Sequence, residues 1–167
     1  VILNHGVMSE RKNVHLLFEA LKFLPRNYKL LLVGSGDPGY AGRINEMIAT
    51  SGLASRVVKV GYTPYPQTPI AYQVSDVFVL PSSWEGVPKV VMQGLSCGVP
   101  CLVSGFKLSE EIKGLFYLES LDPKYIAEYI RAIVENRNIV VDIEKVAVKY
   151  SWDERAKEVG KVYEFAK

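Results

Sequence analysis

The chain has 167 residues, enough to bury one sizeable core but seldom two, so we expect a single domain. Its 20 Lys and Arg nearly balance its 18 Asp and Glu, and this gives no reason to expect nucleic acid as a partner. No apolar segment approaches the roughly 20 residues that span a bilayer, and no charged leader precedes a signal-like core. Two cysteines, Cys97 and Cys101, are expected to be free thiols of a reducing compartment. We therefore expect a cytoplasmic protein, with peripheral membrane association left open for the full-length molecule.

Apolar, β-rich runs alternate with segments of helical period through most of the chain. The first run, VILNH, starts at the first residue, which suggests a piece of a longer protein. Asn13 is then expected to cap a helix, because apolar residues recur after it at the three- and four-residue spacing of one buried face. A second helix is expected to run through Ile44 and to end near Gly52, and shorter ones are expected after Pro88 and at SEEIK (109–113). The six runs that predict strands are 1–5, 28–34, 56–61, 76–82, 99–104 and 115–120.

The tail is predicted to contain helices only, over 123–136, 141–150 and 151–166. In the last of these, Ser151 and Glu154 have the spacing of a capping box. Its apolar residues are expected to form a buried stripe: Ala156, Val159, Val162, Tyr163 and Ala166.

This alternation predicts an α/β fold: a Rossmann-like, doubly wound, six-stranded parallel sheet with helices on both faces and extra C-terminal helices. A sheet of this kind binds ligands outside the carboxyl ends of its strands, near the switch in strand order. The loops that begin at Gly6, Gly34, Gly61, Pro81 and Ser104 are therefore the places to look for a site.

Three of these loops carry residues that suit a phosphorylated nucleotide. In GVMSERKN, Arg11 and Lys12 precede a helix N-terminus, which favours an anion, although these residues alone favour the interpretation that both are solvated loop charges. In VGSGDPG the third glycine of a dinucleotide fingerprint is missing. In WEGVPK, Gly86 permits close approach of the backbone, and Glu85 either lines a cleft or stabilises the helix dipole.

The order of these motifs, with SDVFVLPSSWEGVPKVVMQGLSCGVPCLVS at the centre and YSWDERAKEVGKVYE at the end, resembles the C-terminal half of retaining GT-B glycosyltransferases of family 4, also called glycosyl transferases group 1. The resemblance covers essentially the whole chain. It implies that residues 1–167 form a single donor-binding domain, which binds a nucleotide sugar, and that an N-terminal acceptor domain is absent from this chain. The expected function is transfer of a hexose-type sugar from UDP or GDP, with neither cofactor nor metal.

The resemblance also assigns roles residue by residue. Lys12 matches the lysine that neutralises the donor diphosphate, and Glu85 matches the first acid of an E-x7-E motif, which contacts hydroxyls of the transferred sugar. These two are the expected catalytic residues. The expected donor-binding residues are Gly6, Gly34, Tyr62, Gly86, Val87, Pro88, Lys89 and Gln93, with Tyr62 near the base and Gln93 near the ribose. For Tyr62, ordinary loop packing is an alternative.

Two positions and one loop depart from the family pattern. Val7 stands where the family has a second cation, and Gln93 stands where it has the second acid. An amide offers fewer charge-assisted acceptors than a carboxylate, so weaker ribose binding is expected. The loop SGFKLSEE keeps only Gly105 of a glycine-rich stretch. Lys89 lies one turn before Gln93, and we raise the hypothesis that it reaches toward the phosphates in place of the missing cation; the alternative, which the sequence favours slightly, is a solvated lysine.

Two alternatives remain open at this point. The domain can be a catalytically degenerate nucleotide-binding or partner subunit of the same fold, in which Val7 and Gln93 record lost chemistry. It can also be half of a dinucleotide-dependent oxidoreductase, although the glycine pattern and the absence of an acid after the second strand count against this. The expected partners are a UDP- or GDP-sugar, the protein's own N-terminal domain and an acceptor of unknown type, a glycan, lipid-linked glycan or small molecule. We expect this fragment alone to be inactive as a transferase.

Overall fold

The computed structural model, which describes residues 1–165, contains one parallel sheet whose strands are β1 (Ile2–His5), β2 (Leu30–Val33), β3 (Val57–Val60), β4 (Val77–Leu80), β5 (Cys101–Val103) and β6 (Leu115–Tyr117). Their order is β3-β2-β1-β4-β5-β6, and every neighbouring pair is parallel. The central strands are apolar runs buried on both faces, as a covered parallel sheet requires. The predicted doubly wound sheet is confirmed.

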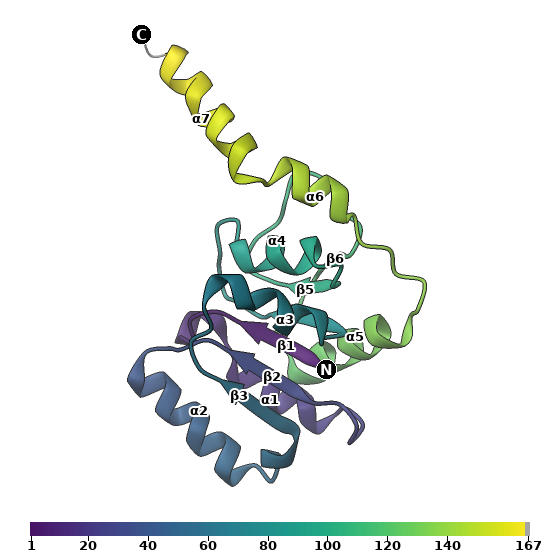
Figure 1. Cartoon of the computed structure of the whole chain (residues 1–167). Coiled ribbons are helices and arrows are strands. Elements are labelled where there is room, and N and C mark those ends of the chain that lie inside the picture. Colours follow the sequence, from purple (N-terminus) through teal and green to yellow (C-terminus); the bar gives the residue numbers. More distant parts are fainter. Residues whose placement is uncertain (166–167) are drawn as a thin grey trace.

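Helices cover both faces of this sheet (Figure 1). The α-helices are α1 (His15–Lys22), α2 (Pro38–Thr50), α3 (Thr68–Gln73), α4 (Lys89–Ser96), α5 (Pro123–Glu135), α6 (Ile143–Lys149) and α7 (Trp152–Phe165). Short 3₁₀ turns lie at η1 (Glu10–Lys12), η2 (Ala54–Arg56) and η3 (Tyr65–Gln67).

The sheet separates two hydrophobic clusters. One contains Phe18 of α1, Ile44 of α2 and Ile130 of α5. The other contains Tyr72 of α3, Leu95 of α4 and Val146 of α6. Because burial of each such side chain contributes about 1.5–3 kcal/mol, the two clusters hold the strand ends, and the loops that follow them, in fixed relative positions.

The approach of α4 to the sheet is unusually close at Gly94. A Cβ atom built at this residue would lie 2.8 Å from Cys101 Sγ and 3.3 Å from the Tyr72 ring. Cys101 is fully buried under the helix, and burial raises the pKa of its thiol. Neither Cys101 nor Cys97 forms a disulfide within residues 1–165, as expected for free thiols.

The predicted buried stripe of the last helix is wrong for the residues described. No residue of α7 is buried, and Val159, Val162 and Tyr163 are exposed, while Ala166 lies outside the described residues. The helix leads away from the sheet and contacts the rest of the described chain mainly through α6 (Figure 1). At its start half of the predicted capping box forms: Ser151 Oγ accepts a hydrogen bond from the Glu154 backbone N–H at 3.1 Å, but the Ser151 N–H donates to the Val148 carbonyl and the Glu154 carboxylate pairs with Lys157.

Three further local predictions need correction. SEEIK is not helical, since a five-residue segment gains few helical bonds and Glu110 instead pairs with Lys145 and Lys149 of α6. Asn13 does not cap α1: its backbone is left-handed (φ 49°) and its side chain bonds another loop. The long loops predicted after β2 and β3 are partly helical, because α2 starts at Pro38, capped by Asp37, and α3 starts at Thr68.

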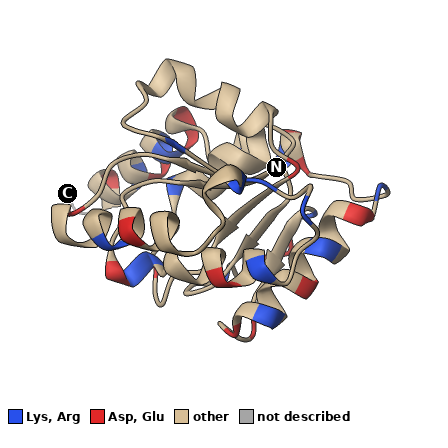
Figure 2. Ribbon diagram, turned by 90° about the horizontal axis from the view of Figure 1, so that it is seen from below, with Lys and Arg blue, Asp and Glu red and all other residues tan. Residues whose placement is uncertain are grey.

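Lys and Arg are interspersed with Asp and Glu along the outer helices in Figure 2, in keeping with the balanced charge count. Among residues 1–165, no helix combines the length and the apolar character that a membrane crossing requires.

Candidate functional site

The loops after β1 and β4 meet at the point where the strand order switches direction. These two strands are neighbours, but the chain continues from β1 to β2 on one side and from β4 to β5 on the other. The Ser83 N–H donates to the Arg11 carbonyl at 2.9 Å, and Asn13 Nδ2 donates to the Pro81 carbonyl at 3.0 Å. The crevice of a doubly wound sheet therefore lies where Arg11, Lys12 and Glu85 were expected.

Four side chains form a cluster in this crevice, which we call the cation–acid cluster: Arg11, Lys12, Ser82 and Glu85. Lys12 Nζ pairs with Glu85 Oε1, and Ser82 Oγ donates to the same oxygen at 2.7 Å. Arg11 Nη1 lies 2.8 Å from Glu85 Oε2. The side chains of Glu85 and Lys12 are only 8% and 13% exposed, so both charges are largely shielded from water.

The surroundings of Glu85 favour its charged form. Burial alone would raise the pKa of this carboxyl, but hydrogen bonds from Lys12, Arg11 and Ser82 outweigh burial and hold the pKa below its ordinary value. Glu85 is therefore a carboxylate at neutral pH. Its Oε1 accepts two bonds from the described residues and its Oε2 faces one cation, so one acceptor position remains on Oε2.

Two glycines allow the backbone approaches that build this crevice. Gly105 has φ +83°, its carbonyl accepts the Glu85 N–H at 2.7 Å, and a Cβ there would lie 2.7 Å from the Ser82 carbonyl oxygen. At Gly34, with φ +118°, a Cβ would lie 2.2 Å from the Gly6 oxygen. Only glycine fits at these two positions, and for Gly6 and Gly34 this close packing is sufficient reason without a ligand.

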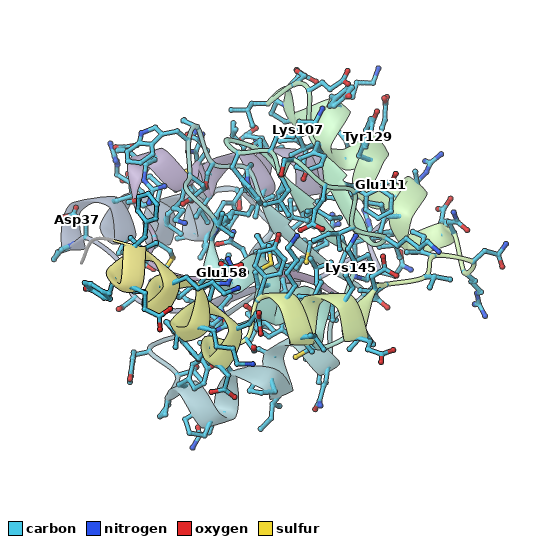
Figure 3. The ribbon with its side chains drawn as sticks, turned by 90° about the horizontal axis from the view of Figure 1, so that it is seen from above. Asp37, Lys107, Glu111, Tyr129, Lys145 and Glu158 are labelled. Atoms are coloured by element: carbon cyan, nitrogen blue, oxygen red, sulfur yellow. The ribbon has the colours of Figure 1, made fainter. Side chains whose placement is uncertain are left out.

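A groove of about 1050 Å³ lies beside α4, and we call it the α4 groove. Its walls come from η3, α3, α4, α6 and α7. Its lining contains three of the predicted donor-binding residues, Val87, Lys89 and Gln93, but none of the cation–acid cluster. In Figure 3, which looks down on α6 and α7, Glu158 lies on α7 and Lys145 on α6. The structure thus places Lys12 and Glu85 in one region and Val87, Lys89 and Gln93 in another, with the segment 85–89 joining the two, while Gly6, Gly34 and Tyr62 belong to neither region.

Gln93 is held by a partly buried set of hydrogen bonds. The Tyr72 hydroxyl donates to the Val90 carbonyl at 2.9 Å and lies 3.3 Å from Gln93 Oε1. His5 Nδ1, at the end of β1, lies 2.9 Å from the same hydroxyl. Burial lowers the pKa of His5 and raises that of Tyr72, so both are neutral at pH 7. The amide of Gln93 therefore engages a neutral partner in the protein.

The remaining predicted residues lie as follows. Lys89 Nζ sits 4.7 Å from the ring centre of Trp152, so it faces α7 in this structure and not the cation–acid cluster. Pro88 caps α4, and Gly86 is exposed beside it. Tyr62 is 79% exposed and is not part of the α4 groove. Val7 is exposed as well, and offers no charge.

Several residues of the site were not predicted from the sequence. Ser82 and Tyr72 bond to the predicted residues, and Tyr65 and Trp152 line the α4 groove. The available signal was Ser82, a polar residue two positions after the end of β4. Within residues 1–165, no group of three or more His, Cys, Asp or Glu side chains is arranged to hold a metal ion.

A parallel sheet of this order, with charged side chains at its switch point, defines a Rossmann-like ligand-binding domain. The chain belongs to the Glycosyl transferases group 1 family, whose profile matches residues 1–150. It is 29% identical over 178 aligned positions to a glycosyltransferase of Methanocaldococcus jannaschii that is described as uncharacterized, covering 99% of this chain and 45% of that protein. It is 30% identical to O-antigen chain mannosyltransferase B of Escherichia coli, covering 65% of this chain and 29% of that protein.

Solved structures support the same fold. Sucrose-phosphate synthase of Thermosynechococcus elongatus superposes with a TM-score of 0.85 at 25% identity, over 99% of this chain and 45% of that one. HepE of Anabaena in complex with UDP-glucose gives a TM-score of 0.84 at 18% identity, over 98% of this chain and 48% of that one. The fold is thus that of GT-B glycosyltransferases. The chain spans less than half the length of each of these relatives.

Proposed function

We propose that this domain binds a nucleoside-diphosphate sugar, with UDP or GDP as the nucleotide, and forms the donor half of a retaining glycosyltransferase for a hexose-type sugar. The observation that carries the proposal is the cation–acid cluster, which brings Arg11, Lys12 and Glu85 together at the switch point of the sheet. Cations there suit a diphosphate and a carboxylate suits sugar hydroxyls. HepE, with the same fold, binds UDP and UDP-glucose, and two relatives are named a mannosyltransferase and a galactosyltransferase.

In this proposal Lys12 and Glu85 act on the two ends of the bond that breaks. As the sugar leaves, negative charge grows on the diphosphate, so the shielded ammonium of Lys12 stabilises the transition state more than the ground state. Glu85 accepts hydrogen bonds from sugar hydroxyls, beginning with the acceptor position that remains on Oε2. A carboxylate built for such bonds discriminates against sugars that lack these hydroxyls.

The nucleoside then extends along the segment 85–89 into the α4 groove. This is supported by the lining of the groove, which includes Val87, Lys89 and Gln93 as well as the aromatic ring of Tyr65. The Gln93 amide, fixed by Tyr72, meets the ribose. The backbone around Gly86 and Pro88 borders the phosphates, and Tyr62 stays a prediction as a residue near the base.

The acceptor half of the site is proposed to lie outside this chain, in an N-terminal domain of the full-length protein. The chain covers 45% of the M. jannaschii relative, which leaves room for such a domain. The acceptor, a glycan, lipid-linked glycan or small molecule, would bind between the two halves. Neither a cofactor nor a metal has a part in this proposal, because Lys12 supplies the charge opposite the diphosphate.

A second candidate is a catalytically degenerate nucleotide-binding or partner subunit of the same fold. Two observations favour it: Val7 is 63% exposed and uncharged, and Gln93 is an amide. Under this alternative, Val7→Arg combined with Gln93→Glu should greatly strengthen nucleotide binding. Under the main proposal, the full-length protein transfers sugar without these changes.

Calorimetric titration of this domain with UDP, GDP and ADP tests the proposal. We expect UDP or GDP to bind, and Lys12→Met to weaken binding at least tenfold, while Lys22→Met, an exposed lysine of α1, has no effect. Absence of binding to all three nucleotides contradicts the main proposal. For the full-length protein, the assay is sugar release from UDP- and GDP-hexoses, with the anomeric configuration of the product read by NMR.

A further inference from the structure

Arg11 is fixed in the cation–acid cluster by three contacts. Its Nη1 lies 2.8 Å from Glu85 Oε2 and donates to the Trp84 carbonyl at 2.6 Å. Its guanidinium carbon lies 4.6 Å from the centre of the Trp84 ring, within the range of a cation–π contact. An arginine held in this way loses little further entropy when it binds a ligand.

Most of the hydrogen-bonding capacity of Arg11 is unused by residues 1–165. A guanidinium has five N–H donors, and the contacts above use Nη1 only. Nε and Nη2 make no hydrogen bond with the described residues, and the side chain is 32% exposed. The planar fork of Arg11 therefore has donors left for a second, external anion.

The charges of the cluster do not cancel. Arg11 and Lys12 share a single carboxylate, Glu85. The other acid of the same loop, Glu10, pairs with Arg43 of α2 instead. One net positive charge thus remains in a largely shielded crevice, where its effect on an anion is stronger than in open water.

Glu85 and an incoming diphosphate would use the same N–H donors. Each Glu85 oxygen faces a cation, and hydrogen bonds from both cations contribute to the lowered pKa of this carboxyl. If the charge of Glu85 is removed while its shape is kept, Lys12 becomes a shielded cation without a counter-charge, which favours binding of an external anion.

We propose that Arg11 is a second phosphate-binding cation, beside Lys12, and that Glu85 is an internal anion that competes with the diphosphate for both. This rests on the proposed function, since the diphosphate is that of the donor. Arg11 thereby supplies from the end of η1 the charge that Val7 lacks. The competition keeps the two cations oriented, and it makes the site favour a diphosphate that also brings hydroxyls for Glu85.

The test is calorimetric titration of the 167-residue chain and its variants with two probes, inorganic pyrophosphate and UDP. Arg11→Gln is expected to lower the binding affinity for both probes about tenfold, in line with loss of one charged hydrogen-bond group. Arg11→Lys keeps the charge but loses the planar fork, so its affinity for both probes should lie between that of Arg11→Gln and that of the wild type. Arg131→Gln on α5 has the same charge change at an exposed pair with Glu135, and should bind as the wild type does.

Glu85→Gln is the decisive variant, because the proposal predicts that loss of an acid from the site strengthens pyrophosphate binding severalfold. The gain should disappear when Arg11→Gln is added. Thermal unfolding confirms that each variant is folded before titration. Unchanged or weaker pyrophosphate binding by folded Glu85→Gln, or Arg11→Gln binding like Arg131→Gln, overturns this inference and leaves the proposed function standing if the wild type binds UDP. A wild type that binds neither probe overturns both.

Discussion

The two regions that carry the predicted site residues are built by different forces. The cation–acid cluster consists of charged groups from two loops that pair with one another in a shielded crevice. The α4 groove is lined mainly by apolar and neutral groups, and its residue Gln93 is held by the neutral Tyr72, whose hydroxyl also contacts the neutral His5. Removal of one partner from a shielded charge pair is costly because it leaves an uncompensated charge, whereas loss of a neutral hydrogen bond costs less. The cluster should therefore be the more sensitive region to single substitutions.

The largest expected effect on stability is that of Glu85→Ala. This change leaves Arg11 and Lys12 without their carboxylate, and we expect the free energy of unfolding to fall by about 3 kcal/mol, as when one partner of a buried pair is removed. Urea denaturation at pH 7 measures it. The control is Glu19→Ala, which breaks an exposed pair with Lys22 and should cost less than about 1 kcal/mol. Equal losses in the two variants would show that the cluster is not shielded as described.

The contribution of Glu85 should also depend on pH. Its pKa in the folded protein lies below the ordinary value of about 4.3 in an unfolded chain, so the stabilisation is fully present above that value and is lost as the pH falls through the folded pKa. The difference in unfolding free energy between wild type and Glu85→Gln should be constant from pH 7 to about pH 5 and shrink toward pH 3. A constant difference down to pH 3 would contradict the lowered pKa.

Among substitutions in the α4 groove, we expect Tyr72→Phe to have the largest effect on the free energy of unfolding. It removes the hydroxyl that donates to the Val90 carbonyl and contacts His5 and Gln93, and we expect the free energy of unfolding to fall by about 1–2 kcal/mol. Tyr65→Phe, at an exposed residue of the same groove, should change stability by less than about 0.5 kcal/mol. Thermal or urea unfolding compares them. A Tyr72→Phe protein as stable as Tyr65→Phe would argue against the hydrogen-bond set.

The contact between Lys89 and Trp152 should be the weakest of these interactions. A double-mutant cycle with alanine at each position should give a coupling energy of about 0.5–1 kcal/mol for this partly exposed cation–π pair. The matched cycle of Trp152 with the exposed Lys161 should give none. If the first cycle also gives none, α7 is not held against α4 through this pair.

The same contrast explains what could be predicted from the sequence. Lys12 and Glu85 follow two strands, β1 and β4, that were predicted as members of a doubly wound parallel sheet, and the topology of such a sheet brings these loops together. The partners of Gln93 were missed because Tyr72 belongs to a helix, α3, that was not predicted. The stripe on α7 was predicted to be buried because periodicity shows that one face is apolar, but not what covers it.

The contact of Gly94 with Cys101 makes that thiol a built-in reporter for motion of α4. With Cys101 fully buried beneath the helix, an alkylating reagent reaches the sulfur only when α4 lifts from the sheet. The alkylation rate of Cys101 therefore reports how often α4, the helix that carries Gln93, separates from the sheet. Any ligand that contacts both the cation–acid cluster and the α4 groove should lower the alkylation rate of Cys101. The size of the decrease measures how strongly the ligand stabilises α4 in its packed position.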